Sequence, residues 1–276
     1  VTFAMSGESD NGITFGASVD LDETDGATSN AFVENSQGGE TIFISGDFGT
    51  LTMGDTDGAL DKAVAENDVI GDISDASTTF SNVSFGNVDG NDNDGQVARF
   101  DYSIAGFGLS LSAETDDSNT DRTVWGFGAT YSIAGWNFGA GYQGGEGSMM
   151  ETVEATAVGV LVDADGNTYD VTEEVETGNT ITTDFEQWAV SASTTFGPVD
   201  VMANYGEYIV NDSRALDVVT ARYSTGGVYT MDALSVGLMY GETHTDTDGA
   251  LGETEKGFGL AANYDLGGGL VLKAGY

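Results

Sequence analysis

Two groups of charged side chains in this 276-residue chain could act on dissolved ions. The first group lies in segments that alternate apolar and polar residues, so that every second side chain faces the same way. Its members are all on the polar side: Arg99, Asp101, Arg222 and Lys273. The second group is a set of acids in the segment 56–95, namely Asp57, Asp61, Glu66, Asp68, Asp72 and Asp75. A basic wall facing an acidic loop would create a field across a narrow aqueous passage. The alternative is that these acids belong to a solvated loop.

A further acidic group suits hard cations. It comprises Asp163, Asp165, Asp170, Glu173 and Glu174. Carboxylate oxygens are the ligands that calcium prefers, but the spacing is not that of an EF-hand, because Thr168 occupies the position that needs glycine. A specific calcium site and loose screening by cations are both open, and divalent ions held here could bridge the chain to anionic lipopolysaccharide. We expect no cofactor to be required.

Composition argues against an enzyme and against nucleic acid as a partner. The chain has no Cys, and its single His, His244, lies in an acidic loop with no motif that supplies a nucleophile. The formal net charge is −39, from 46 acids against 7 Lys and Arg. Nucleic acids and anionic membrane surfaces attract basic proteins, whereas this balance favours cations. Because 39% of the residues are hydrophobic and 10% aromatic, we expect a folded chain despite its acidity.

The elements that must position the charged residues are strands. Residues 125–133 illustrate the pattern: the odd positions are Trp125, Phe127, Ala129, Tyr131 and Ile133, and the even positions are Gly, Thr and Ser. About fourteen such segments follow one another. Short turns such as Asn11-Gly12, which favours a hairpin, alternate with long acidic loops. The longest connections are 56–95 and 144–183, and within the second the pieces 153–162 and 169–175 could form a small external hairpin.

This pattern predicts an all-β fold: an antiparallel transmembrane β-barrel that forms a single domain, 1–276. Strands of about ten residues with aromatic ends, short turns on one side and long loops on the other are typical of outer-membrane barrels. No apolar run is long enough for a transmembrane helix, so strands are the only means of crossing a membrane. A soluble all-β adhesin or fibre module is the alternative, because any half-buried antiparallel sheet also alternates.

Two stretches carry a family resemblance. The segment FGTLTMGDTDGA, 48–59, resembles the part of Gram-negative general diffusion porins, especially the alphaproteobacterial type, that leads into their pore-constricting loop. Residues 1–22, with the turn GESDNG, are similar to an early hairpin of those proteins. The resemblance implies a homotrimeric outer-membrane channel, and it places 56–95 at the inward-folded third loop. The alternation of short turns and long loops puts both ends of this chain on the long-loop side, whereas bacterial barrels keep both termini in the periplasm, so we expect one more strand at each end and sixteen in the intact protein. The family's first strand and its terminal aromatic residue are not matched in this chain.

The function we expect is passive diffusion of ions and small hydrophilic solutes through a water-filled pore that prefers cations, with outer-membrane lipid and lipopolysaccharide as surroundings. A substrate-specific channel would need aromatic residues along the lumen, whereas here the aromatic residues mostly take the apolar face. A non-transporting surface adhesin would have no use for an acidic loop of mixed apolar content at 56–95.

Overall fold

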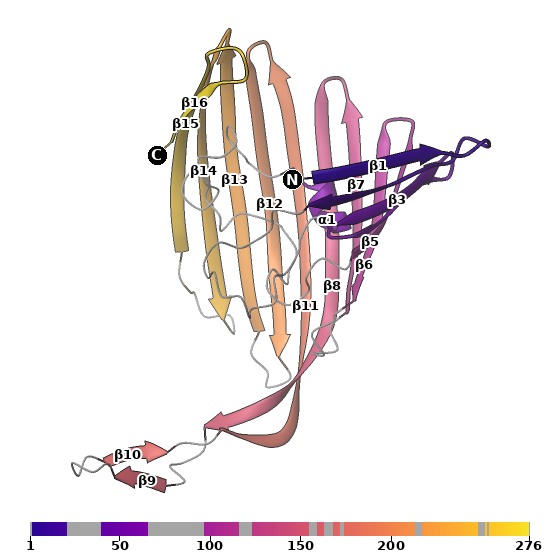
Figure 1. Ribbon diagram of the computed structural model, residues 1–276. Coiled ribbons are helices and arrows are strands. Elements are labelled where there is room, and N and C mark those ends of the chain that lie inside the picture. Colours follow the sequence, from indigo (N-terminus) through magenta and orange to yellow (C-terminus); the bar gives the residue numbers. More distant parts are fainter. Residues whose placement is uncertain are drawn as a thin grey trace.

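The computed structural model describes residues 2–20, 40–65, 97–115, 123–154, 159–162, 168–171, 174–212, 217–247, 252 and 254–275. Within them, fourteen strands form one antiparallel sheet, and strands that follow one another in the sheet order are hydrogen-bonded neighbours. A separate two-stranded hairpin, β9 with β10, is inserted between β8 and β11. The sheet is strongly curved (Figure 1). The prediction of an all-β fold with about fourteen antiparallel strands is confirmed.

The elements have the following bounds: β1 Thr2–Glu8, β2 Thr14–Asp20, β3 Thr41–Gly46, β4 Gly49–Gly54, α1 Ala59–Ala63, β5 Val97–Ile104, β6 Phe107–Thr115, β7 Thr123–Ile133, β8 Trp136–Glu154, β9 Gly159–Val162, β10 Thr168–Val171, β11 Glu174–Phe196, β12 Val199–Asp212, β13 Asp217–Met231, β14 Leu234–Thr247, β15 Thr254–Asp265 and β16 Val271–Gly275. No helix among the described residues has the length and apolar composition needed to cross a membrane.

The short turns have the geometry that joins twisted antiparallel strands. Ala105 and Gly106, between β5 and β6, have φ values of 52° and 85°, and Ala134 and Gly135, between β7 and β8, have 52° and 84°. Positive φ at both central residues is the type I′ turn, whose twist matches that of the flanking strands. These turns hold neighbouring strands in a fixed register, so the faces predicted from alternation are preserved from strand to strand.

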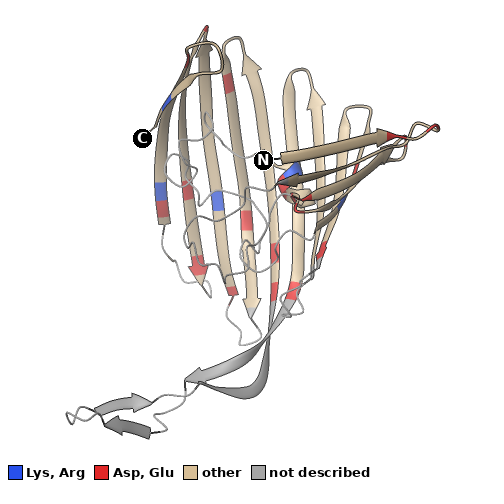
Figure 2. Ribbon diagram, viewed as in Figure 1, with Lys and Arg blue, Asp and Glu red and all other residues tan. Residues whose placement is uncertain are grey.

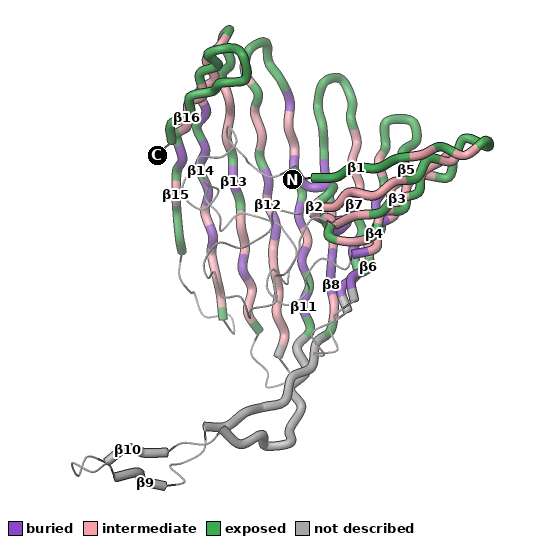
Figure 3. The backbone as a smooth tube through the Cα atoms, in the orientation of Figure 1, coloured by how far each residue is buried: buried purple, intermediate pink, exposed green. Residues whose placement is uncertain are grey.

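The two faces of the sheet differ sharply in chemistry. On β7, Trp125 and Phe127 are 53% and 43% exposed, whereas Gly126 and Gly128, which alternate with them, are buried. The same alternation of exposed and buried positions runs along most of the central strands (Figure 3). A contiguous apolar surface of this extent is unfavourable in water. It suits the hydrocarbon region of a membrane, as the predicted lipid-facing side requires.

The strands around the second long connection extend further than the sequence pattern suggested. β8 and β11 remain paired from Trp136 and Thr194 as far as Glu154 and Glu174, with one irregularity between Glu176 and Thr180. Strand structure therefore covers much of the segment 144–183, which was expected to be loop. Backbone pairing continues where the apolar alternation that marks the membrane-facing part has ended. The hairpin formed by β9 and β10 lies close to the two pieces expected to form it.

Candidate functional site

The helix α1 lies on the small, polar face of the sheet, inside its curve, against β6, β7 and β8 (Figure 1). Glycines on β7 and β8 make this approach possible. A Cβ at Gly141 would meet the Leu60 Cα at 2.7 Å, and one at Gly128 would meet the carbonyl oxygen of Ala59. A Cβ at Gly139 would likewise meet the carbonyl oxygen of Ala63. Because glycine has no side chain, the helix backbone rests directly on the two strands.

The apolar side of α1 is fully covered by this contact. Leu60 is 0% exposed and forms a small core cluster with Val64 and Ala189, which lies on β11. Burial of one leucine side chain contributes roughly 1.5–3 kcal/mol. The polar face of the sheet therefore carries an apolar patch at one place, and the segment that follows β4 occupies it.

Hydrogen bonds tie the same segment to three strands, β6, β11 and β12. The Ala59 backbone N–H donates to Ser112 Oγ on β6 at 2.9 Å, and the Ala65 N–H donates to Ser191 Oγ on β11 at 2.9 Å. Asn204 on β12 donates from Nδ2 to the Ala65 carbonyl oxygen at 3.2 Å. The segment thus crosses the polar face from β6 to β12. It is held at both of its described ends.

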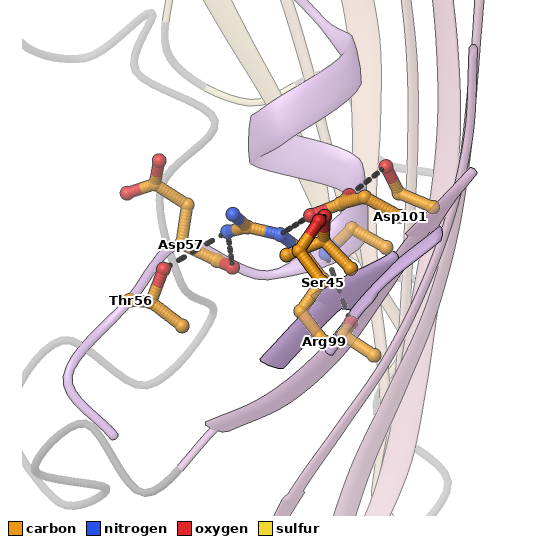
Figure 4. A network of polar contacts seen from close by, with 9 residues as sticks. Ser45, Thr56, Asp57, Arg99 and Asp101 are labelled. Carbon is orange, nitrogen blue, oxygen red and sulfur yellow. Dashed lines mark hydrogen bonds and ion pairs between the residues drawn. The ribbon is translucent and has the colours of Figure 1, made fainter. Parts of the chain in front are cut away.

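Arg99 holds the entry to this segment (Figure 4). Its Nη1 donates to Thr56 Oγ1 at 3.0 Å and to the backbone carbonyl oxygen of Asp57 at 2.5 Å. Its Nε forms an ion pair with Asp101 Oδ2 at 2.9 Å, and Ser110 Oγ donates to the other Asp101 oxygen at 2.6 Å. The Arg99 side chain is only 7% exposed. Arg99 is therefore buried, its charge is balanced by Asp101, and it holds Thr56 and Asp57 against β5.

Among the described residues, the carboxylate that pairs with Arg99 is that of Asp101. The expectation that Arg99 faces the carboxylates of the loop stays a prediction, because most of those acids lie outside the described residues. Asp101 is two residues away on the same face of β5, so its carboxylate reaches the guanidinium first, and the ion pair that forms is with Asp101. From the loop, Asp57 contributes its backbone carbonyl oxygen to Arg99. The prediction that Arg99 and Asp101 share the polar face agrees with these contacts.

The other predicted residues are placed as follows. Arg222, half-buried on β13, shares the polar face with Ser224, whose N–H and hydroxyl both donate to Asn204 Oδ1. Lys273 on β16 is exposed and pairs in register with Asn263. Asp57 is exposed, and Asp61 on α1 is half-buried. Glu66, Asp68, Asp72 and Asp75 lie outside the described residues.

The expected calcium ligands are only partly described. Asp163, Asp165 and Glu173 lie outside the described residues, while Asp170 and Glu174 belong to β10 and β11. In the part of the chain that the structure describes, no three potential metal ligands come together. The calcium hypothesis stays a prediction.

Sequence reasoning did not identify the residues that seat α1. The glycines at alternate positions of β7 and β8 were the available signal, because glycine within a strand often marks the close approach of another backbone. Ser112, Ser191 and Asn204 carried no signal, since small polar residues are found all along this face. Their hydrogen bonds to 59–65 depend on which segment crosses the sheet.

Comparison with known proteins agrees with this architecture. The family model described as Gram-negative porin matches residues 1–276. A porin from Rhodobacter capsulatus is 27% identical over 293 residues, covering 100% of this chain and 84% of that protein.

Solved structures show the same fold. One porin structure, at 22% identity and a TM-score of 0.67, covers 99% of this chain and 84% of its own. The outer-membrane protein OmpT of Vibrio cholerae in its trimer form has 14% identity and a TM-score of 0.64, covering 100% of this chain and 79% of its own. An anion-selective porin from Comamonas acidovorans has 14% identity and a TM-score of 0.63, covering 97% of this chain and 74% of its own.

The family match over the whole chain agrees with the sheet of fourteen antiparallel strands, its apolar outer face, and the segment laid across its polar face. This chain belongs to the Gram-negative porin family.

Proposed function

We propose that this outer-membrane porin conducts cations in preference to anions, through a pore that the segment 56–65 narrows. Passive diffusion of small hydrophilic solutes across the outer membrane, without catalysis, follows from membership of the family. The finer proposal concerns where the pore is narrowest and which ions it favours.

The observation that carries the proposal is the seat of α1 on the polar face. A helix whose backbone rests on Gly128 and Gly139 and whose Leu60 is fully buried takes up space on the side of the sheet opposite the lipid-facing one. Anything that passes along the polar face must go around it. The hydrogen bonds of Arg99 to Thr56 and Asp57 keep the entry to the segment against the wall.

Charge supports a preference for cations. Arg99 is paired with Asp101, so the guanidinium closest to the segment adds little net positive potential. Asp57, which meets Arg99 through its backbone carbonyl oxygen, is exposed, and acids mark the strand ends near the long connections (Figure 2). The anion-selective porin from Comamonas acidovorans shares the fold, so local side chains, and not the architecture, decide the sign.

The test is the reversal potential across a KCl gradient in planar bilayers, measured for the protein and for an Asp57→Asn, Asp61→Asn double variant. We expect a cation preference that the double variant reduces. Asp47→Asn, in the exposed turn between β3 and β4, is the matched control and should leave the potential unchanged. An anion preference of the unaltered protein in dilute salt would reject the proposed selectivity. Equal shifts of the reversal potential in both variants would show that the segment 56–65 does not determine the selectivity of the pore.

Assembly as a homotrimer is part of the same proposal. Its support is family membership together with the trimer form of the structurally similar Vibrio cholerae protein. Light scattering of the detergent-solubilised protein, corrected for bound detergent, should give three times the mass of the 28.6 kDa chain. A mass of one chain would contradict it.

A further inference from the structure

An apolar groove lies on the outward face of β12 to β15, away from the pore. Its volume is about 680 Å³, within the range of roughly 300–1,000 Å³ that is usual for ligand sites. It is lined by side chains that alternate with the polar-face residues, among them Val201, Tyr229, Leu238, Tyr240 and Phe258. Gly227 stands between Val201 and Leu238 in the register of the three strands. Because Gly227 has no side chain, the surface is hollowed there.

One end of the groove is polar. The hydroxyls of Tyr223 and Tyr240 both donate to Glu242 Oε2, at 2.6 Å and 2.9 Å, and Lys256 Nζ lies 3.3 Å from the same oxygen. The Lys256 side chain is 59% exposed, whereas that of Glu242 is 19% exposed. Three donors already surround the carboxylate oxygen. An ammonium has three N–H groups, so Lys256 can still donate to a further anion.

The position of Lys256 is unusual for this chain. Of its 7 basic residues, those that the structure places on the strands are Arg99, Arg222 and Lys273 on the polar face and Lys256 on the outward face. With a net charge of −39, an anion approaching the protein is repelled over most of the surface. Among the described strands, Lys256 is the one basic residue on the outward face, and it lies at the end of the groove.

The side of the membrane follows from the topology. Lys256 lies near the start of β15, after the connection 248–253, and so at the end of the sheet that bears the long connections. In outer-membrane barrels these connections face outward from the cell. A lipid whose headgroup meets Lys256 is therefore in the outer leaflet. Its acyl chain would run from Phe258 and Tyr240 towards Val201 and Tyr229.

We propose that this groove binds one acyl chain of lipopolysaccharide, with a phosphate of its lipid A on Lys256. The apolar hollow receives the acyl chain, and the exposed ammonium of Lys256 at its outer end binds the phosphate. The site is independent of the pore and of its selectivity.

The experiment is native mass spectrometry of the intact protein in detergent, titrated with bisphosphorylated lipid A, with dephosphorylated lipid A and with phosphatidylethanolamine. Two variants address the two halves of the site: Val201→Trp fills the groove, and Lys256→Gln removes the ammonium. Leu260→Trp, on the same outward face of β15 but not lining the groove, is the matched control for Val201→Trp, and dephosphorylated lipid A is the control for Lys256→Gln. Single-channel conductance, unchanged in every variant, verifies that each one has folded.

We expect Val201→Trp to abolish binding of both forms of lipid A. Lys256→Gln should weaken binding of bisphosphorylated lipid A by roughly fivefold, the effect of about 1 kcal/mol for one basic residue near an anionic surface. It should leave binding of the dephosphorylated form unchanged. Binding that survives Val201→Trp, or an equal loss for both forms in Lys256→Gln, overturns the proposal. Preferred binding of phosphatidylethanolamine would identify a phospholipid as the occupant of the groove. Loss of self-association in Val201→Trp would identify a second copy of the chain as the occupant. Either outcome also rejects it.

Discussion

Arg99 shows that a charged residue on a pore wall need not act on permeating ions. Its Nε is paired with Asp101 and its Nη1 binds Thr56 and the backbone of Asp57, in an almost fully buried position. Burial of a guanidinium is tolerated because these partners accept hydrogen bonds from three of its five N–H groups and Asp101 balances its charge. Its principal effect is to hold the first residues of the segment 56–65 against β5.

Replacing Arg99 with Met tests this role. Hydrogen bonds to charged groups contribute about 1.5–3 kcal/mol each to stability, so the free energy of unfolding in urea should fall by roughly that amount or somewhat more. Single-channel conductance should rise, because the entry to the segment is released. Lys256→Met, which removes an exposed cation from the outward face of β15, is the control and should leave both quantities nearly unchanged. A more stable Arg99→Met protein with unaltered conductance would show that Arg99 does not hold the start of the segment 56–65 in place.

At the scale of elements, the contact between α1 and the glycines of β7 and β8 has a steric test. In Gly128→Val the new side chain meets the carbonyl oxygen of Ala59, which is backbone and cannot rotate away. We expect α1 to be displaced, at a cost of about 1–3 kcal/mol from overpacking, with larger conductance.

Gly108→Ala is the matched control for Gly128→Val. Gly108 is on the same face of β6, but the atom its Cβ would meet most closely is the hydroxyl of Thr130, which can rotate. Heat stability and conductance of this variant should stay close to those of the unaltered protein. If Gly128→Val behaves like Gly108→Ala, the helix does not define the narrow part of the pore.

The hairpin of β9 and β10, inserted between β8 and β11, is an element that the barrel should not need. Glu154 and Glu174 are opposite one another in the register, so a two-residue Asn-Gly turn can replace 155–173 without moving either strand. We expect the shortened protein to insert into bilayers and conduct. Loss of folding would show that the inserted hairpin supports the sheet.

The same deletion tests the calcium hypothesis, because it removes Asp163, Asp165, Asp170 and Glu173. A ligand at a hundred times its Kd stabilises the folded state by about 2.7 kcal/mol. If calcium binds there specifically, millimolar CaCl₂ should raise the Tm of the full chain and leave that of the shortened chain unchanged. An equal rise in both would indicate non-specific screening.

At the scale of the whole molecule, the net charge of −39 acts over a range set by the salt concentration. The Debye length is about 10 Å at 0.1 M and about 3 Å at 1 M. We expect the cation preference to weaken between these concentrations, because distant acids are screened first. A reversal potential that gives the same selectivity at both would show that charges within a few ångströms of the ions determine it.

The sequence alone was sufficient for the faces of the strands and their order, but not for the full length of β8 and β11. Alternation such as that from Trp125 to Ile133 places side chains on two faces with period two, and turns such as Ala134-Gly135 have few possible geometries. These are local properties, because they depend on residues close together in the chain. The polar-face placement of Arg99, Asp101 and Arg222 followed from them directly.

Only the tertiary structure decided which groups meet across the polar face. Leu60 could be buried in many ways, and its position depends on glycines of β7 and β8 that lie far from it in sequence. Likewise, nothing local indicates that Thr56 and the backbone of Asp57 would bind Arg99, which lies 43 and 42 residues further along the chain. The pairing follows from distance and burial, which arise when non-adjacent strands curve around a common interior, and alternation within a strand contains no information about them.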